Sequence, residues 1–556
     1  MILVDRDAAD RFAEAEVWGK VTLDGLLARL AAARPDDVAV TDPGERIGWQ
    51  RSFGPAVSWT EIDRMVSAVA AVLLDAGLKQ DDVVGIQLAN SVEALVTHLA
   101  ALRAGLIPAA MPITWREMEL AEACDRVAPV ALVTASRIGP NDHADLMMRV
   151  AFQSMSVRHI FAYGASVPDG VTPLNPALSL EASTEGANGA PRVGNPADHV
   201  AMLTFVSWDG ALEPLARSHN QWLSAAAELA LDARVGPDAV LATSLLPTSL
   251  TGLTSALGVW LLSGCRLNLV MPITSAAFCR EVARMEATHL ILPGNLTHLV
   301  EQLDPGRRLR LVRYWASADA LSTSGRDSAG DGTTDVISLD EMAITTGSGS
   351  KALVLPLAGT GGDGPADPKR PLLAARMMGN LHKAGSNVVP GALLSGALMV
   401  GGPQVPTAPF PGRPPEAEQP FRFRPHPDGF RETGLRCRLV DSDGPSLVVL
   451  GHRKETFVVG GFAVAAERLD VLYGGYEGFL DAAAASIPDP MFGERIVAAV
   501  VPQSGRDCSL ASFRAHLREL GVASHLIPDR ILTVREIPRS ADGTILRSTL
   551  ATSLAA

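Results

Sequence analysis

Lysine is scarce in this chain, and other common features are missing as well. Its 556 residues include six lysines, whereas Lys and Arg together total 48, so arginine carries most of the positive charge. Asp and Glu total 61, which leaves a formal net charge of −13 at pH 7. Nucleic acids and anionic membrane surfaces repel a polyanion. We therefore expect neither as a partner.

Long apolar runs and paired cysteines are also missing. No apolar run approaches the roughly 20 residues that span a bilayer, and the first residues lack a basic region followed by an apolar stretch. We expect no membrane span, no signal peptide and a cytoplasmic protein. The five cysteines lie far apart without metal-ligand spacing. This indicates a reduced compartment and buried thiols, and it predicts no metal site.

Alternating helix and strand patterns fill the first 140 residues or so. A capping-box pattern, Ser58-Trp-Thr-Glu61, opens an apolar-striped helix that ends at Gly77. Further strands are predicted at 83–88, 107–111 and 130–134, and further helices at 91–104 and 117–125. The pattern resumes with a helix at 221–231 and strands at 240–246 and 290–292. Such alternation favours a mainly parallel sheet covered on both faces.

The second half has a different character. Residues 323–335 are predicted to form a polar loop, and 359–369 and 403–428 are rich in Gly and Pro, which is typical of irregular connections. After Gly451 a compact segment of about 100 residues follows, with predicted strands at 457–459, 496–501 and 530–534. Its predicted helices lie at 465–472 and from Ser509 to before Gly521. This segment is a candidate separate α+β domain.

Seven blocks carry a family resemblance: 82–93, 99–112, 396–403, 428–434, 451–464, 489–494 and 535–547. They include Asp428-Gly-Phe-Arg-Glu-Thr-Gly434 and the tail Ile537-Pro-Arg-Ser-Ala-Asp-Gly-Thr-Ile-Leu-Arg547. In this order they resemble the adenylate-forming superfamily of acyl-CoA synthetases, aryl-acid ligases and peptide-synthetase adenylation domains. The resemblance implies an α/β fold. We expect a large domain over 1–450, with doubly wound mixed or parallel sheets and a small barrel-like subdomain, and a small mobile α+β domain over 451–556.

The catalytic positions of this family are altered here. Thr544 stands where the family tail has a lysine that neutralises charge as a carboxylate attacks the α-phosphate of ATP. Counting back from His219, in Arg217-Ser-His-Asn220, places Glu213 at the lysine of the phosphate loop. Ser207, Asp209 and Gly210 fall in that loop, and a carboxylate there would repel triphosphate oxygens. Two other interpretations of this segment stay open. It is an ordinary strand–turn–helix, or it binds a cation through Asp209 and Glu213.

The nucleotide and metal positions differ too. Leu435 replaces the aspartate that binds the ribose hydroxyls, and His452 replaces an arginine, for which Arg453 could substitute after a register shift. Ala343 falls at the Mg²⁺-binding glutamate. Asp340 and Glu341 could offer oxygens nearby, or they are simply polar residues at a strand end. No cofactor is predicted from the residues themselves; ATP, Mg²⁺ and CoA are implied by the resemblance alone.

Other family positions are retained. Lys454 lies at the hinge about which the tail domain rotates, and Gly460 and Gly461 resemble the loop that lines the entry path of the thiol. Scattered pocket positions between 247 and 346 are expected to select the acid. Our candidates for this lining are Ser249, Leu250, Tyr314, Trp315 and Ala316.

Three hypotheses follow. In the first, adenylation is lost and the chain is a binding, regulatory or partner-docking scaffold. In the second, an enzyme of altered chemistry processes a pre-activated acyl group, with His219, His289 or His452 as candidate base. In the third, the chain is an active acyl-CoA or aryl-acid ligase. The expected partners are a carboxylic acid, an acyl-thioester or a carrier protein, and a homo- or hetero-oligomer stays open.

Overall fold

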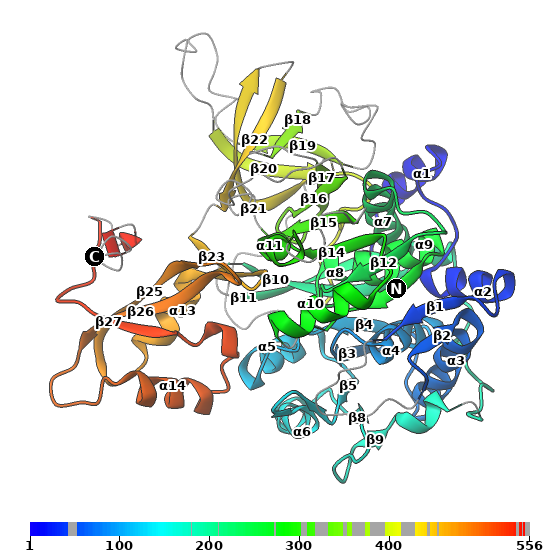
Figure 1. Ribbon diagram of the computed structural model, residues 1–556, viewed down its shortest axis with the longest axis horizontal. Coiled ribbons are helices and arrows are strands. Elements are labelled where there is room, and N and C mark those ends of the chain that lie inside the picture. The colour runs from blue at the N-terminus through cyan, green and yellow to red at the C-terminus, as the bar shows by residue number, and fades with distance from the viewer. Residues whose placement is uncertain are drawn as a thin grey trace.

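The chain folds into a large lobe of stacked sheets and a smaller lobe built from its C-terminal part, as the computed structural model shows (Figure 1). The residues that the structure describes are 1–42, 53–179, 181–208, 211–271, 274–301, 309–316, 332–347, 353–357, 373–378, 395–412, 429–441, 445–452, 455–540, 544–547 and 549–550.

A seven-stranded sheet forms one layer of the large lobe, in the order β11-β10-β4-β3-β5-β8-β9. Its pairs are parallel except β10 with β11, which are antiparallel. The strands are β3 (Val83–Gln87), β4 (Ile107–Ala110), β5 (Ala131–Ala135), β8 (His159–Tyr163), β9 (Thr172–Pro173), β10 (Val200–Trp208) and β11 (Ala211–Ser218). The helices that connect or flank them include α4 (Val92–Arg103), α5 (Glu117–Val127) and α6 (His143–Gln153).

An eight-stranded sheet forms the second layer, in the order β17-β16-β15-β14-β12-β13-β1-β2. Only the outermost pairs, β16 with β17 and β1 with β2, are antiparallel. The strands are β1 (Val38–Thr41), β2 (Ala56–Ser58), β12 (Val240–Thr243), β13 (Arg266–Leu269), β14 (His289–Pro293), β15 (Arg310–Trp315), β16 (Thr333–Ser338) and β17 (Ile344–Gly347). Its helices are α2 (Leu23–Ala33), α3 (Trp59–Asp75), α7 (His219–Ala233), α10 (Ser275–Arg284) and α11 (Thr297–Glu301).

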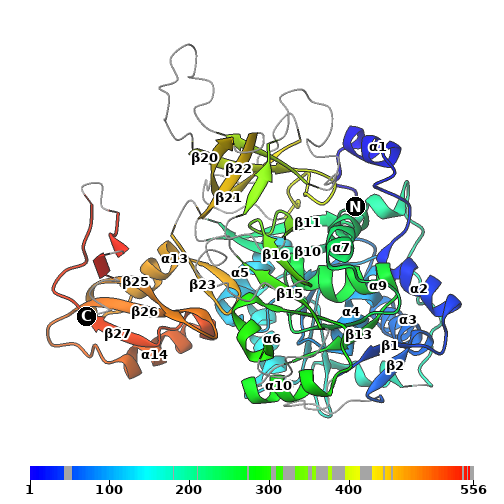
Figure 2. The ribbon, with the colours of Figure 1, turned by 45° about the horizontal axis from the view of Figure 1, so that its top comes forward.

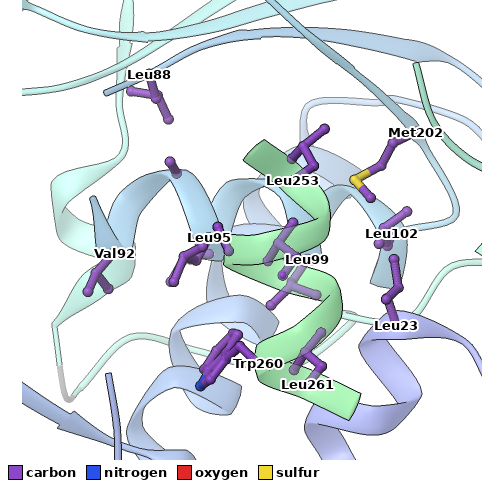
Figure 3. Packing of buried hydrophobic residues seen from close by; sticks show 14 of the residues in the cluster. Leu23, Leu88, Val92, Leu95, Leu99, Leu102, Met202, Leu253, Trp260 and Leu261 are labelled. Atoms are coloured by element: carbon purple, nitrogen blue, oxygen red, sulfur yellow. The ribbon is translucent and has the colours of Figure 1, made fainter. Parts of the chain in front are cut away.

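The main core lies around α4, which is buried along nearly its whole length. In Figure 3, Leu95 and Leu99 of α4 lie beside Leu253, on a helical segment that runs from Leu250 to Ser263. This segment widens into a π-helical turn over Thr254–Val259 and resumes as α9 (Trp260–Ser263). Trp260 then stacks on Trp59 of α3, with ring centroids 4.9 Å apart, and its Nε1 donates to the Ala39 carbonyl at 3.0 Å.

A five-stranded antiparallel sheet, in the order β18-β22-β21-β20-β19, adjoins these layers at the top of Figure 1. Its strands are β18 (Val354–Pro356), β19 (Ala374–Met378), β20 (Ser395–Gly401), β21 (Arg431–Asp441) and β22 (Pro445–His452). Their buried side chains share one apolar cluster with β10, β11 and β15. This sheet is the expected barrel-like part.

The small lobe has its own sheet and its own apolar core. Strands β24 (Phe462–Ala465), β23 (Thr456–Val459), β26 (Gly493–Pro502) and β25 (Phe479–Asp489) lie in this order, and β27 (Arg530–Thr533) pairs with β26. Helices α13 (Ala466–Gly474) and α14 (Leu510–Glu519) pack on them. Both views show this lobe, coloured orange to red, beside α5 of the large lobe (Figure 2).

The predicted fold class is confirmed, and so is the Ser58–Glu61 capping box, in which both hydrogen bonds form. The boundary between residues 450 and 451 stays a prediction. The expected polar loop over 323–335 is wrong at 333–335, which belong to β16. The sequence predicts Asp335 to be a loop residue. In the structure it is buried, and its carboxylate accepts hydrogen bonds from Arg313 Nε at 2.8 Å and from Trp315 Nε1 at 2.7 Å.

Other predicted connections fall partly or wholly outside the described residues. These are 323–331, 359–369 and 413–428. Residues 403–412 are irregular, as expected. None of the helices in the described part of the chain has the length and apolar character that crossing a membrane requires.

Candidate active site

A cavity of about 750 Å³ lies between the two lobes. The large lobe lines it with Phe205–Ser207 of β10, with residues 244–249 after β12, and with side chains that follow β15 and β16. The small lobe closes it with Val459–Ala465. Most of this lining is apolar, whereas the carboxyls of Asp340 and Glu341 lie on the wall of the large lobe. The cavity therefore suits an apolar molecule with a small polar end.

Gly460 and Gly461 form the tip of the β23–β24 hairpin and face this cavity. Both have positive φ angles, +59° and +88°, which disfavour any residue with a Cβ atom. Gly460 N donates to the Phe492 carbonyl at 2.8 Å. A Cβ atom on Gly461 would lie 3.8 Å from the ring of Tyr314, so the glycine tip reaches the wall of the large lobe. The two glycines therefore line the cavity, and their part in an entry path for a thiol stays a prediction.

The lobes are joined around α5. Arg468 of the small lobe pairs with Glu122 at 3.1 Å, and Glu122 also accepts from Leu212 N at 2.6 Å. Met118 N donates to the Gly521 carbonyl at 3.2 Å. Thr544 is exposed in this arrangement, and its backbone carbonyl accepts from Ser540. The lobes thus bring the glycine loop to the cavity but leave Thr544 outside its lining.

The segment expected to match the phosphate loop is a tight hairpin. Phe205 pairs with Pro214 and Trp208 with Ala211, so two residues connect the strands. Glu213 is half-buried on β11 opposite Val206 and does not line the cavity. Burial raises its pKa, although nearby Arg126 opposes this. Most of the backbone on either side of the tip is committed to the strand ladder, which differs from an open loop that cradles phosphate.

Ser207 lines the cavity together with Phe205, Val206 and Leu212 of the same two strands. Its hydroxyl is buried and finds no hydrogen-bond partner among the described residues. Four of the predicted site residues lie outside the described residues: Asp209, Gly210, Arg453 and Lys454.

His219 starts α7 and is buried away from the cavity lining. Its Nδ1 accepts from Leu23 N at 3.1 Å, and burial lowers its pKa to about 4. His289 also lies outside the lining, with Nε2 3.1 Å from the Ala233 carbonyl. Both rings hold neighbouring backbone in place. These contacts are typical of structural histidines. Neither ring lines the cavity, so the placement gives no support to a catalytic role for either.

Leu435 and His452 are paired across β21 and β22. Leu435 is fully buried in the apolar cluster of the barrel-like sheet, so it offers no polar group to a ribose. The His452 Nε2 lies 3.8 Å from Asp340 Oδ1. Asp340 in turn accepts from Gly434 N at 2.6 Å. Leu435 and His452, which stand at the family's ribose positions, therefore lie next to Asp340, whose carboxyl contacts His452 and the backbone of Gly434.

Asp340 and Glu341 form a turn between β16 and β17, and both have positive φ angles, +56° and +58°. Glu341 Oε2 accepts from Leu250 N at 2.7 Å. Burial raises the pKa of Glu341 to about 7; the Leu250 N–H and Arg217 oppose the rise, and Asp340 adds to it. The sequence left open whether these two residues offer oxygens to Mg²⁺ or are simply polar residues at a strand end. It did not indicate that their carboxyls would line the cavity.

The described residues do not assemble a metal site of the expected kind. None of their His, Cys, Asp and Glu side chains gathers in a group of three or more that could hold an ion. Asp340 and Glu341, the nearest candidates for Mg²⁺, both accept from backbone N–H groups. Ala343 is fully buried among apolar residues.

Among the predicted pocket residues, Ser249, Tyr314 and Ala316 line the cavity, whereas Leu250 and Trp315 do not. Trp315 is turned into the cluster of the barrel-like sheet. Sequence reasoning missed the aromatic pair of Phe462 and His525, whose rings stack 5.1 Å apart on the small-lobe side. Residues from distant parts of the chain meet here, and no local pattern signals such a meeting.

Two sheet layers, a barrel-like sheet and a small lobe that presents a glycine hairpin to a shared cavity define a two-lobed α/β fold. The model of the family described as AMP-binding enzyme matches residues 27–326, which is more than half of the chain. The chain belongs to this family, within the adenylate-forming superfamily.

Characterised relatives match over nearly the whole chain. The salicyl-AMP ligase / salicyl-S-ArCP synthetase of Mycobacterium tuberculosis is 28% identical over 557 residues, which cover 97% of this chain and 92% of the relative. A salicylyl-CoA synthase / salicylate adenylyltransferase of a Streptomyces species is 27% identical, with 97% and 95% covered.

Solved structures agree with this fold. The apo structure of MbtA from Mycobacterium smegmatis has a TM-score of 0.64 and 25% identity, covering 99% of this chain and 98% of that one. The amide bond synthetase McbA from Marinactinospora thermotolerans has a TM-score of 0.71 at 21% identity, with 95% and 99% covered. The second likeness concerns the fold alone.

Proposed function

We propose that this chain is a divergent acid–thiol ligase that activates an apolar carboxylic acid as its acyl adenylate and passes the acyl group to a thiol. One observation carries the proposal: the glycine hairpin at Gly460 and Gly461 faces the apolar cavity between the lobes, at the wall formed by Tyr314. The full-length similarity to relatives named as salicylate-activating ligases supports the same reaction. A carrier-bound thiol or CoA is the proposed acceptor.

The size and chemistry of the cavity support an aryl-sized acid. Its volume of about 750 Å³ lies within the range of small-molecule pockets, roughly 300–1,000 Å³. Phe205, Leu245, Phe278 and Tyr314 offer apolar or aromatic surface, and Ser207 and Thr248 offer hydroxyls. A flat acid such as salicylate or benzoate has matching chemistry.

Pyrophosphate exchange tests the activation half. We expect exchange of labelled pyrophosphate into ATP that depends on an aryl acid, measured with salicylate, benzoate and a short-chain fatty acid. Stabilisation of the fold by ATP in a thermal-shift assay is the companion measurement, because a ligand that binds only the folded state must stabilise it. Heat-inactivated protein is the control. No exchange with any acid would contradict ATP-dependent activation.

A second candidate is favoured by the tight hairpin at 205–214 and by Glu213 at the position of the family lysine. Here the chain binds or processes an acyl group that another enzyme has activated, or it serves as a non-adenylating scaffold. Absence of exchange together with transfer from a synthetic acyl adenylate would support the enzyme of altered chemistry. Absence of both reactions, with retained binding of the acid, would support the scaffold.

Replacing Gly461 with alanine is expected to slow the thiol step about 10-fold and to leave pyrophosphate exchange unchanged. A Cβ atom at a φ of +88° costs about 1–2 kcal/mol, which moves the hairpin away from the cavity wall. The measurement is thioester formation from synthetic salicyl adenylate and CoA. Gly505→Ala, at a left-handed turn that does not line the cavity, is the matched control. An equal loss in both reactions would contradict a specific role of the hairpin.

A further inference from the structure

The hairpin of β10 and β11 lies at the edge of its sheet, next to the small lobe. β11 is the outermost described strand of the seven-stranded sheet, and along such a strand every second N–H points away from the neighbouring strand. Leu212 N points outward in this way and donates to a carboxylate of α5 at 2.6 Å. Pro214, the next outward position, has no N–H. The edge near the tip of the hairpin is therefore held through Leu212.

The carboxylate is that of Glu122, and it contacts both lobes. Its Oε1 accepts from Leu212 N, and its Oε2 lies 3.1 Å from Nη2 of Arg468, on α13 of the small lobe. The side chains of Arg468 and Glu122 are 14% and 27% exposed, so water screens the pair only in part. Hydrogen bonds to an ionised group are also stronger than neutral ones. One carboxylate thus holds the hairpin with one oxygen and the small lobe with the other.

Packing fixes α5 between the hairpin and the small lobe. Leu120 of α5 shares an apolar cluster with Leu212 of β11. On the other side, a Cβ atom on Gly521 of the small lobe would lie 2.7 Å from Cβ of Glu117, so α5 and the small lobe are in close contact there. β10 also runs beside β24, and both views show β10, α5 and the small lobe side by side (Figures 1 and 2). A movement of the small lobe therefore changes the surroundings of Glu122.

Other contacts join the lobes through residues outside the hairpin. Ala523 N lies 3.4 Å from Oε1 of Glu119, and Asn295 Nδ2 donates to the carbonyl of Met491. These contacts act through α5 and through the turn after β14. Glu122 differs from them, because it also binds the edge of the hairpin.

We propose that Glu122 couples the docking of the small lobe to the closure of the hairpin at 205–214. While Arg468 stays in place, it keeps the carboxylate turned toward Leu212 N. When the small lobe moves away, the carboxylate loses its cation and becomes free to turn into water, so the hairpin loses its outer support. Opening of the hairpin in turn draws Glu122 off Arg468. Because coupling between two sites is reciprocal, each event changes the equilibrium of the other by the same factor.

The coupling has a consequence for catalysis, which rests on the acid–thiol reaction proposed above, whereas the coupling itself does not. In the docked arrangement the glycine hairpin lines the cavity, and the strand ladder takes up most of the backbone of residues 205–214. Backbone held in a ladder cannot turn toward a triphosphate. Glu122 therefore favours transfer to the thiol over activation by ATP. Arg468→Met is expected to shift the ratio of pyrophosphate exchange to transfer from synthetic salicyl adenylate about 5-fold toward pyrophosphate exchange.

Hydrogen exchange measured by mass spectrometry tests the coupling without any substrate. Arg468→Met is expected to speed hydrogen exchange about 5-fold in two segments, 521–527 of the small lobe and 211–218 of β11, the lower end of usual couplings because the pair is partly exposed. Arg468 contacts Glu122, and Glu122 contacts Leu212, so faster hydrogen exchange in β11 reports the coupling. Glu122→Gln keeps an oxygen for Leu212 N but no charge for Arg468, and it is expected to give the same two changes.

A double variant and a matched control sharpen this test. Glu122→Gln combined with Arg468→Met is expected to match either single variant, because both changes break one pair and the effects of residues in contact do not add. Arg149→Met is the control: it removes an arginine that lies 3.1 Å from Glu117 of the same helix, but both residues belong to the large lobe. It is expected to leave both segments unchanged. Circular dichroism and hydrogen exchange in the buried helix α4 check that each variant folds.

The outcomes separate the coupling from the ligase proposal. Faster hydrogen exchange in 521–527 with unchanged hydrogen exchange in 211–218 would overturn the coupling, and so would additive effects in the double variant or no change in either segment. If Arg468→Met does not fold, Glu122→Gln decides by the same two segments. Coupled hydrogen exchange in a protein that shows neither pyrophosphate exchange nor transfer would overturn the ligase proposal alone.

Discussion

Thr544→Lys is expected to raise acid-dependent pyrophosphate exchange about 10²–10³-fold, the range that one well-placed transition-state donor typically supplies. A lysine at this family position neutralises charge as the carboxylate attacks the α-phosphate, and the hydroxyl of threonine cannot. Thr544 is exposed and outside the cavity lining, so the effect requires the small lobe to turn. Transfer from preformed salicyl adenylate is expected to stay unchanged, because the glycine hairpin proposed for that step already lines the cavity while position 544 lies outside it.

Ala511→Lys is the matched control, since it adds the same charge to an exposed site on α14 of the same lobe. It is expected to leave both reactions unchanged. Equal exchange by native protein and Thr544→Lys would mean that position 544 never reaches the phosphate. A similar rise of pyrophosphate exchange in Thr544→Lys and Ala511→Lys would mean that the added charge, and not its position, causes the effect.

Acid is expected to unfold this protein steeply between pH 6.5 and about 4.5. Burial lowers the pKa of six described histidines: His98, His219 and His525 to about 4, His143 to about 3, and His199 and His289 in the same direction. Below pH 6.5 the unfolded chain binds protons that the folded chain excludes, so stability falls as the pH falls. Each histidine contributes up to about 1.4 kcal/mol per pH unit.

The raised pKa of Glu341, about 7, acts in the opposite sense, because there the folded state binds the extra proton. The contribution of Glu341 and the four histidines His98, His143, His219 and His525 to the slope is then on the order of 3–4 kcal/mol per pH unit near the middle of this window. Urea unfolding at several pH values measures it. His98→Gln is expected to flatten the slope, whereas the exposed His298→Gln should leave it unchanged. A free energy of unfolding that is constant over this window would contradict neutral burial of these rings.

Local patterns predicted the elements well, because capping and apolar periodicity are written in neighbouring residues. The helix that begins after Ser58 and the one after Ser509 both start as predicted. The same reasoning placed Asp335 in a loop, since its buried partner Arg313 lies 22 residues away. Ion pairs between distant residues leave no local signal.

A contiguous motif gave the clearest sequence signal for the candidate site, although the scattered candidates Ser249, Tyr314 and Ala316 also line the cavity. Gly460 and Gly461 lie at the cleft because a hairpin tip with positive φ needs glycine, whatever surrounds it. The sequence offered Glu341 as a possible oxygen donor but could not show its surroundings, because these are built from Arg217 and Leu250, each about 90 or more residues away in the chain. Counting from motifs also cannot reveal that residues 205–208 pair with 211–214 as antiparallel strands.

The π-helical turn over Thr254–Val259 makes the core sensitive to the length of the chain at that point. One residue turns an α-helix by about 100°, so shortening this turn by one residue would rotate everything after it by that angle. Trp260 would then lose its stacking on Trp59 and its hydrogen bond to the Ala39 carbonyl. We therefore expect insertions and deletions between Leu253 and Leu261 to destabilise the fold, even at positions where substitutions are tolerated.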